Sequence, residues 1–206
     1  DYCPENSPRS LYEFLPTIGR NEAKFGKFSY RSGSTDVIGW VLEKATGQPL
    51  AELISTHVWK PMGAEYDANI TVDEGGFVLG DHGMSSTLRD LTRLGLLVLN
   101  KGKAFGTQVV PADFIEDMHS QSGDPYWPYT ADEGLEPYYR SFWWGEGNDG
   151  RDLSGVGIHG QFVRVVPESN MVIVLYSTWP RADGDGITHG WDKAAELQNA
   201  LIGNFQ

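Results

Sequence analysis

The residues that could do chemistry in this sequence begin with a tyrosine and a serine two positions apart. Tyr30 and Ser32 stand in FSYRSGSTDVIGWVLEKATG (28–47), in a polar turn directly before an apolar helical segment. A tyrosine hydroxyl can move protons if a neighbouring cation favours its phenolate form, although its ordinary pKa of about 10 makes it a poor base at neutral pH. The alternative is a turn tyrosine that only packs on the start of the helix. An acid–base role for Tyr30 therefore requires partners elsewhere in the sequence.

Other catalytic and metal-binding motifs do not occur. The sequence has no G-x-x-x-x-G-K-[ST], no H-E-x-x-H, no G-x-G-x-x-G after a strand and no G-x-S-x-G elbow. The five histidines do not fall at metal-ligand spacing, and the single Cys3 excludes an internal disulfide and a cysteine-rich zinc site. The acidic segments ADGDGIT and GNDGRD lack the remaining ligands of a calcium loop, so we interpret them as surface turns. We expect neither a metal nor a cofactor.

Composition favours a soluble globular protein. Apolar residues make up 40% and charged residues 21% of the 206 residues, and no apolar run is long enough to span a membrane. The net charge of −12 would repel nucleic acids and anionic membrane surfaces, so we expect neither as a partner. It fits an enzyme that handles neutral or cationic substrates.

Helical patterns occupy the first part of the chain after an irregular lead-in. Ser34 is predicted to cap the first long helix, with Asp36 in its first turn facing the positive helix end, and Gly47 is predicted to stop it. Further helices are predicted from Pro49 to about Val58, over 85–102 and over 110–120.

The pattern then changes to β-structure. Strands are predicted near 140–145, over 157–167 and over 170–179, followed by a C-terminal helix over 190–205. Both long strands are apolar at most positions, which indicates burial on both faces, yet one C-terminal helix covers one face only. Three strands would also leave two open edges. The sequence therefore resembles part of a larger sheet domain.

The segment around Tyr30 resembles the tyrosine motif of the penicillin-recognising serine hydrolases, which include class C β-lactamases, D-Ala-D-Ala carboxypeptidases and esterases. In that family a Tyr-x-Asn or Tyr-x-Ser turn precedes a helix that ends in Glu-x-x-Thr-Gly, as at Glu43, Thr46 and Gly47. GDHGMSSTLRDLTRLGLLVL is similar to the next family segment. GVGIHGQ, the preceding WW, TDVIGW and STWP most resemble the branch of 6-aminohexanoate-dimer hydrolases, which are amidases and esterases.

The resemblance implies roles for individual residues. Tyr30 would take the proton of the nucleophilic serine and return it to the leaving group, and Ser32 would hydrogen-bond the lysine or the substrate. The backbone N–H of Ile158 would form half of the oxyanion hole. Since Gly155-Val156-Gly157-Ile158 lacks the family's Lys-Thr pair, the resemblance favours an amidase or esterase over a β-lactamase.

The resemblance also implies substrate contacts, each with a structural alternative. Trp144 would cover the substrate, or else be a half-buried strand aromatic. Asp81 and His82 would shape the pocket for the substrate amine, or else lie in a solvated loop. His159 would act near the oxyanion strand, or else be a structural histidine. The Ile158 side chain is expected to be a core strand residue.

One family element is missing from the sequence. The nucleophile of this family is the serine of Ser-x-x-Lys, and no serine from Ser7 to Ser177 has a lysine three residues later. The segment before Tyr30 is also too short to hold it. We therefore expect the nucleophile, together with further strands and a helix of the sheet, on a segment absent from this chain.

The resulting prediction is an α/β fold: the C-terminal half of a β-lactamase-like serine hydrolase domain, active through an acyl-enzyme. Residues 1–206 would form the C-terminal part of one domain, with a mainly helical region over 28–125 and strands plus the C-terminal helix over 138–206. The expected partners are the N-terminal half and a small amide or ester substrate, and a homodimer stays open. We expect a cytoplasmic protein, with a periplasmic or secreted location also open because any targeting segment would precede Asp1.

Two rival functions remain. Within the enzyme class, the rival is a β-lactamase or a D-Ala-D-Ala carboxypeptidase. Outside it, the rival is a non-catalytic sensor or carbohydrate-binding module, whose aromatic segments DPYWPYT and PYYRSFWW would stack on sugars.

Overall fold

The computed structural model describes residues 7–19, 29–120, 138–145, 151–182 and 190–205. These residues form two compact units, each described by itself: unit 1 comprises Asp1–Lys60 and Tyr66–Ser86, and unit 2 comprises Pro61–Glu65 and Thr87–Gln206. None of the helices in the described ranges combines the length and the apolar character needed to cross a bilayer.

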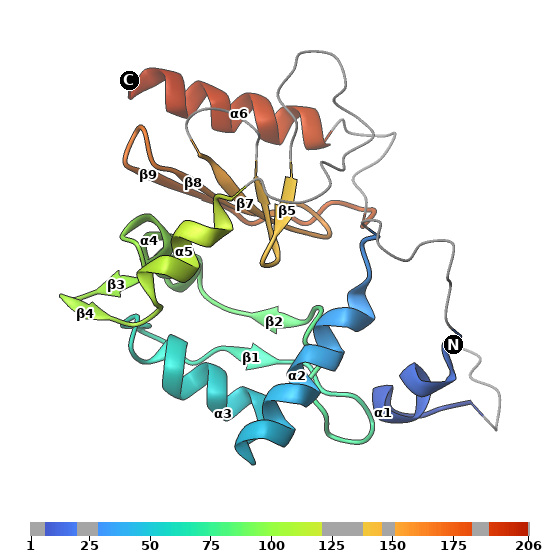
Figure 1. The fold of residues 1–206 in the computed structure, drawn as a ribbon. Coiled ribbons are helices and arrows are strands. Elements are labelled where there is room, and N and C mark those ends of the chain that lie inside the picture. The colour runs from blue at the N-terminus through green and yellow to red at the C-terminus, as the bar shows by residue number, and fades with distance from the viewer. Residues whose placement is uncertain (1–6, 20–28, 121–137, 146–150, 183–189, 206) are drawn as a thin grey trace. The chain divides into compact units, whose positions relative to one another are not determined.

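Unit 1 is built around helix α2 (Figure 1). Its elements are α1 (Leu11–Phe14), the 3₁₀ turn η1 (Leu15–Thr17), α2 (Ser32–Thr46), α3 (Leu50–Ile54), the π-helical turn η3 (Ser55–Trp59) and the strand pair β1 (Asn69–Ile70) and β2 (Met84–Ser85).

The Tyr12 ring fixes α1 in unit 1. It stacks on the Trp40 ring of α2, with ring centroids 3.9 Å apart, and it contacts Phe77 at 4.0 Å. Gly47 ends α2 in the left-handed conformation, with φ 69°, and its N–H donates to the Glu43 carbonyl. The predicted stop at Gly47 is therefore confirmed.

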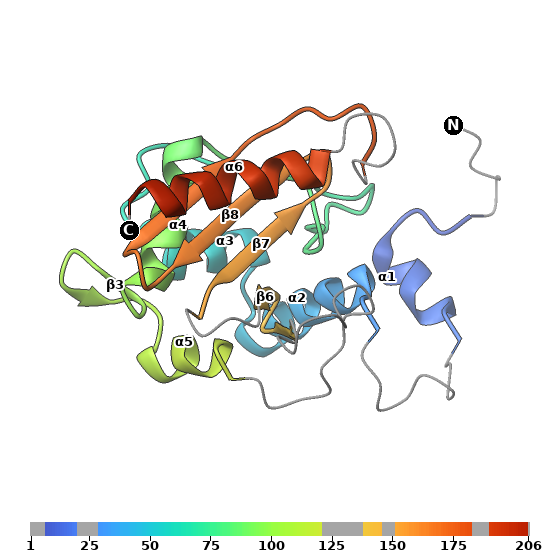
Figure 2. The same cartoon turned by 90° about the horizontal axis from the view of Figure 1, so that it is seen from above.

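Unit 2 is an antiparallel sheet with a helix on each face (Figures 1 and 2). The helices are α4 (Leu88–Leu99), α5 (Ala112–Met118) and α6 (Gly190–Asn204), and the small strands β3 (Lys103–Ala104) and β4 (Thr107–Gln108) form a hairpin between α4 and α5. The sheet runs β5 (Tyr138–Arg140), β6 (Trp143–Gly145), β7 (Leu153–Gly157), β8 (Gln161–Val166) and β9 (Met171–Leu175), in that order.

Side chains of β8 alternate between the two faces of this sheet. Val165 joins the buried cluster of Val98, Ile115, Met118 and Leu153 on the face covered by α4 and α5. On the opposite face the Phe162 ring meets the Trp191 ring of α6 edge to face, 5.3 Å away. This period-2 alternation explains why apolar residues occupy four of the six positions of β8, on both faces of the sheet.

The C-terminal helix α6 is not the only helix on this sheet, because α4 packs on β8 and β9. A Cβ on Gly95 of α4 would lie 2.5 Å from a methyl carbon of Val172, so only a glycine lets the helix approach this closely. Within the described sheet, β5 and β9 are still the edge strands.

The sheet has five strands where the sequence predicted three. β5 and β6 pair through a turn at Ser141 and Phe142, whose φ angles are 51° and 67°. β7 and β8 pair through a turn that contains His159, whose φ is 58°. The β5–β6 turn has neither the glycine nor the asparagine that normally marks a left-handed turn, so this hairpin was hidden in the sequence. The β7–β8 turn does contain a glycine, Gly160, whose φ is 83°.

The buried Asp90 carboxylate lies in the first turn of α4. It is 0% exposed, its Oδ1 accepts from the Glu65 N–H at 2.8 Å and from Arg93 Nη1 at 3.0 Å, and its Oδ2 accepts from the Thr87 hydroxyl at 2.8 Å. The Thr87 hydroxyl in turn accepts from the Asp90 N–H, so Thr87 is the N-cap of α4. This carboxylate joins the 61–65 segment to the start of α4.

We expect Asp90→Ala to lower the free energy of unfolding by about 3 kcal/mol, because it leaves Arg93 and two donors without their buried acceptor. Urea-induced unfolding measures the change. Glu196→Ala, which removes an exposed carboxylate from α6, is the control and should shift stability by no more than about 0.5 kcal/mol. An Asp90→Ala protein as stable as this control would contradict the assignment.

Candidate active site

Tyr30 and Ser32 lie at the start of α2. The helix begins at Ser32 with Arg31 as its N-cap, so the predicted cap at Ser34 is wrong by one turn. Tyr30 is 58% exposed, and Ser32 is also exposed. The backbone therefore presents both side chains at the N-terminal end of a long helix, where the helix dipole favours negative charge.

Asp36 of the same helix is buried, which corrects its predicted place facing the positive helix end. It is only 2% exposed, and its Oδ1 accepts a hydrogen bond of 2.8 Å from the Gly80 N–H. Gly80 lies close enough that a Cβ there would contact the Thr35 carbonyl oxygen at 3.4 Å. Asp36 thus connects α2 to a segment 44 residues further along the chain.

That segment carries the predicted pocket residues Asp81 and His82. His82 Nδ1 and Asp81 Oδ1 are 2.5 Å apart, and the Asp81 side chain is the more buried of the two. Gly83, with φ 81°, follows them, and its carbonyl accepts from the Thr71 N–H at 3.1 Å. The Asp81–His82 pair is therefore anchored on both sides, by Asp36 at Gly80 and by Thr71 at Gly83.

Burial raises the pKa of Asp36 above its ordinary value, and the Asp81 carboxylate raises it further, while the Gly80 N–H and His82 act in the opposite direction. The folded protein accordingly binds this proton more tightly than the unfolded chain. The stability that Asp36 contributes is full at low pH and is lost as pH rises through its raised pKa.

Asp36→Asn should remove this pH dependence. We expect the unfolding free energy of the wild type, measured relative to Asp36→Asn, to fall between pH values near the ordinary aspartate pKa of about 3.9 and neutral pH. Urea unfolding at a series of pH values measures this difference. A constant or rising difference would show that the Asp36 pKa is not raised.

The predicted oxyanion donor Ile158 lies in unit 2, in the turn directly after β7. Its side chain is 61% exposed, so the interpretation of this side chain as a core strand residue is wrong. The strand itself ends at Gly157, which pairs with Gln161 of β8. A turn position leaves the backbone of Ile158 outside the strand ladder.

His159 fastens this turn to the chain that follows β9. Its N–H donates to the Ala182 carbonyl at 3.0 Å, its carbonyl accepts from the Trp179 N–H at 3.2 Å, and its Nδ1 lies 2.8 Å from the Trp179 carbonyl oxygen. Because a carbonyl only accepts, Nδ1 must carry the hydrogen. Gln161 also donates, from Nε2, to the carbonyls of His159 and Ser177. These contacts give His159 a structural role; its substrate contact stays a prediction.

Trp144 lies on β6, opposite Ser154 of β7 and Tyr139 of β5. Its ring tilts against the Tyr139 ring at 57°, with centroids 4.5 Å apart, and the residue is half-buried. Trp144 thus lies on the strand next to β7, and Ile158 directly follows β7.

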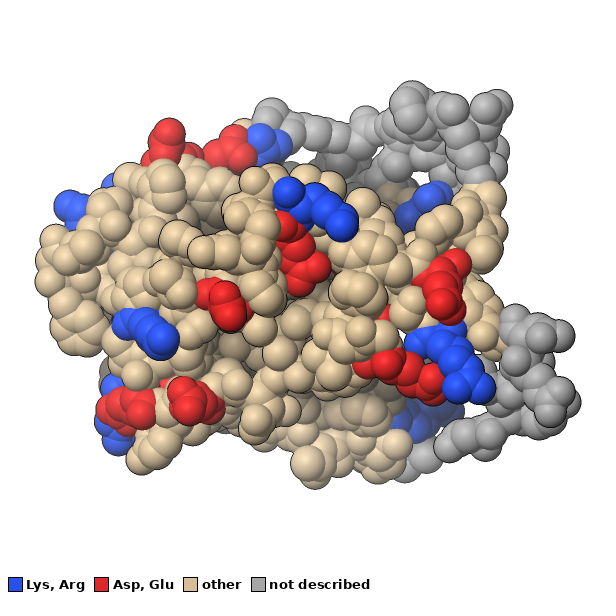
Figure 3. All heavy atoms as spheres, turned by 90° about the horizontal axis from the view of Figure 1, so that it is seen from below, with Lys and Arg blue, Asp and Glu red and all other residues tan. Residues whose placement is uncertain are grey.

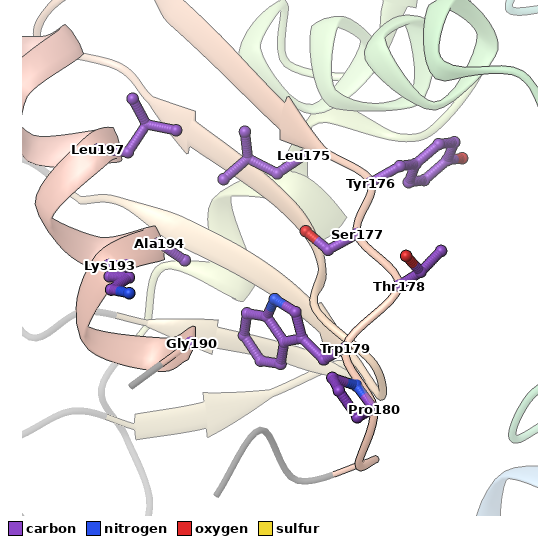
Figure 4. A pocket seen from close by; sticks show the side chains of 10 residues that line it. All are labelled: Leu175, Tyr176, Ser177, Thr178, Trp179, Pro180, Gly190, Lys193, Ala194 and Leu197. Atoms are coloured by element: carbon purple, nitrogen blue, oxygen red, sulfur yellow. The ribbon is translucent and has the colours of Figure 1, made fainter. Parts of the chain in front are cut away.

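A cavity of about 520 Å³ opens in unit 2 between α6 and the chain that continues from β9 (Figure 4). Its walls include Leu175, Trp179, Ala194 and Leu197, with Lys193 near one side. None of the predicted site residues lines it. It lies instead along the edge strand β9.

Metal ligation has no support in the described ranges, where no group of three His, Cys, Asp or Glu side chains could hold an ion. On the face in Figure 3, acidic and basic side chains of the described residues are interspersed.

Comparison with known proteins decides the family. The Beta-lactamase family model matches residues 4–197. This chain belongs to the beta-lactamase family. The 6-aminohexanoate-dimer hydrolase of Paenarthrobacter ureafaciens is 39% identical over 184 residues, which cover 87% of this chain and 46% of that protein.

Solved structures agree with this assignment. A Bacillus anthracis protein assigned as a 6-aminohexanoate-dimer hydrolase superposes with a TM-score of 0.82 at 28% identity, over 96% of this chain and 49% of that one. A Bacteroides dorei protein assigned as a β-lactamase superposes with a TM-score of 0.68 at 15% identity, over 98% and 68%. The predicted β-lactamase-like α/β fold is therefore confirmed, and the chain spans about half the length of the 6-aminohexanoate-dimer hydrolases it matches.

The predicted site residues fall into two groups, one in each compact unit. Tyr30, Ser32, Asp81 and His82 belong to unit 1, where Asp36 joins their two segments directly. Trp144, Ile158 and His159 belong to unit 2. Asp36 was not among the predicted site residues. Its place on the same helical stripe as Gly39 and Trp40 indicates burial, but its contact with Gly80 has no signal in the local sequence.

Proposed function

We propose that this chain provides the acid–base tyrosine, one oxyanion donor and the substrate pocket of a serine hydrolase that cleaves amide or ester bonds. The main supporting observation is the pair Tyr30 and Ser32, exposed at the start of α2, with the Asp81–His82 pair held on the same helix through Asp36. The 39% identity to a 6-aminohexanoate-dimer hydrolase supports an amide substrate.

The proposed reaction proceeds through an acyl-enzyme. A serine outside this chain attacks the carbonyl carbon while Tyr30 accepts its proton, and the Ile158 N–H donates to the developing oxyanion. The C–N or C–O bond then breaks, and the proton passes from Tyr30 to the leaving amine or alcohol. Water hydrolyses the acyl-serine by the same proton route. Asp81, beside His82, would attract the ammonium group of a substrate such as an aminohexanoate dimer.

The nucleophile requires a partner segment, which we propose to be the N-terminal half of the same enzyme. Its docking place would be the edge strand β9 and the cavity between β9 and α6, where apolar walls face an open side. Mass spectrometry of an active preparation tests this. A single 22.8 kDa species that folds and hydrolyses esters without a second polypeptide would refute it.

A fluorophosphonate probe tests the serine mechanism. We expect one covalent adduct on a serine of the associated segment, and competition by aminohexanoate dimers. No adduct on any polypeptide of the complex would favour a non-catalytic sensor or carbohydrate-binding module. Of the aromatic segments that suggested sugar binding, DPYWPYT lies outside the described residues.

Substrate preference distinguishes the proposed amidase or esterase from the rival β-lactamase. We expect turnover of short-chain esters and aminohexanoate dimers to exceed turnover of a chromogenic cephalosporin, because Gly155-Val156-Gly157 offers no Lys-Thr pair for a β-lactam carboxylate. Faster turnover of the cephalosporin would favour a β-lactamase.

A further inference from the structure

We propose that Asp36 is a positioning residue that holds the Asp81–His82 pair in place for substrate binding. The proposal rests on the proposed function, since that function assigns the substrate amine to Asp81 and His82. The proposal is based on one contact: the Asp36 carboxylate on α2 accepts a hydrogen bond of 2.8 Å from the N–H of Gly80, the residue directly before Asp81.

Burial makes this contact stronger than a surface hydrogen bond. Asp36 is 2% exposed, and its Oδ1 accepts the hydrogen bond of the Gly80 N–H. A charged acceptor and a backbone N–H form one of the stronger classes of hydrogen bond, and a low local dielectric increases its strength. Loss of the oxygen would leave the Gly80 donor without this acceptor.

The location of Asp36 links this contact to the reaction. Asp36 lies in the helix that begins at Ser32, directly after Tyr30. The same helix therefore carries the proposed proton-transfer group and, through one side chain, the segment proposed to bind the amine. A shift of segment 80–82 would change where the substrate ammonium is held relative to Tyr30, and small misplacements in such sites lower rates strongly.

Burial opposes the ionised form of Asp36, and the Asp81 carboxylate opposes it further, whereas the Gly80 N–H and His82 favour it. A carboxyl oxygen can accept from the Gly80 N–H in either protonation state, so Asp36 can hold the segment next to the proposed amine-binding pair whether or not it is charged.

Three variants of the complete enzyme test the proposal. Asp36→Ala removes the acceptor, Asp36→Asn keeps an oxygen at the same place, and Asp67→Asn changes an exposed aspartate of the same unit as a control. Each is measured for KM and kcat with aminohexanoate dimer, and for hydrogen exchange of the Gly80 amide.

We expect Asp36→Ala to raise KM about tenfold or more and to speed exchange of the Gly80 amide at least about tenfold. Asp36→Asn should stay within about threefold of the wild type in KM and keep Gly80 protected, because its Oδ1 can still accept. Asp67→Asn should match the wild type. If Asp36→Ala does not fold, the protected Gly80 and near-normal KM of Asp36→Asn remain a direct test.

Several results would overturn the proposal. A wild-type KM or wild-type Gly80 exchange in Asp36→Ala would do so, as would equal losses in the Asn and Ala variants. A lower kcat at unchanged KM would indicate fewer folded molecules and a purely structural role. If the wild-type enzyme hydrolyses none of the substrates, the proposed function fails, while Gly80 exchange still decides whether Asp36 holds the segment.

Discussion

Replacing Tyr30 by phenylalanine should lower kcat/KM for amide and ester substrates by at least about 100-fold, the size of effect typical of a lost general acid–base group. The variant keeps the aromatic ring and removes only the hydroxyl, which the proposed mechanism uses in both halves of the reaction. Since Tyr30 is 58% exposed, the loss of one hydroxyl should not unfold the protein. Steady-state kinetics with an ester and with an aminohexanoate dimer measure the effect.

Tyr66→Phe is the matched control for this change. Tyr66 belongs to the same unit and is 62% exposed, so its replacement removes a similarly exposed hydroxyl. We expect its kcat/KM to stay within about twofold of the wild type. Near-wild-type kinetics of Tyr30→Phe would refute the acid–base role, and equal losses in both variants would point to a general loss of folded protein.

The helices were predictable because their signals are local. The position of α4, the Gly47 stop of α2 and the extent of α6 all depend on residues close together in the chain. Tyr30 and Ser32 were found in the same way, because their motif is contiguous.

The sheet was harder to predict because its turns use unusual residues. The β7 segment Leu-Ser-Gly-Val-Gly has two glycines and a serine, and the turn after it places His159 at positive φ. Local propensity gives no sign of a strand there. Its formation depends on pairing with β8 and on the hydrogen bonds of His159 to the chain after β9.

The role of Asp36 could not be predicted from local sequence for a related reason. An aspartate early in a helix normally stabilises the helix end by facing water and the helix dipole. Here the burial of Asp36 depends on Gly80, which approaches only after the chain has returned through β1 and the following turn. Long-range contacts of this kind decide which polar residues become part of a site.

We expect the backbone N–H of Ile158 to contribute far more to kcat than its side chain. If this N–H donates to the oxyanion, Ile158→Pro should lower kcat by about 100-fold to 1,000-fold with a smaller change in KM, because the contact forms fully only in the transition state. Ile158 is not among the residues with positive φ, and the preceding Gly157 is extended in β7, so neither feature excludes a proline here.

Ile158→Ala separates the donor from the side chain. The alanine variant keeps the N–H and removes a side chain that is 61% exposed, so we expect only a several-fold loss of kcat. Equal kcat values for the two variants would exclude Ile158 as an oxyanion donor. Urea unfolding of both proteins shows whether the proline disturbs the turn that His159 fastens to Trp179 and Ala182. A large loss of kcat at unchanged stability would therefore place the oxyanion at the end of β7, where a strand ends and its next backbone donor leaves the sheet.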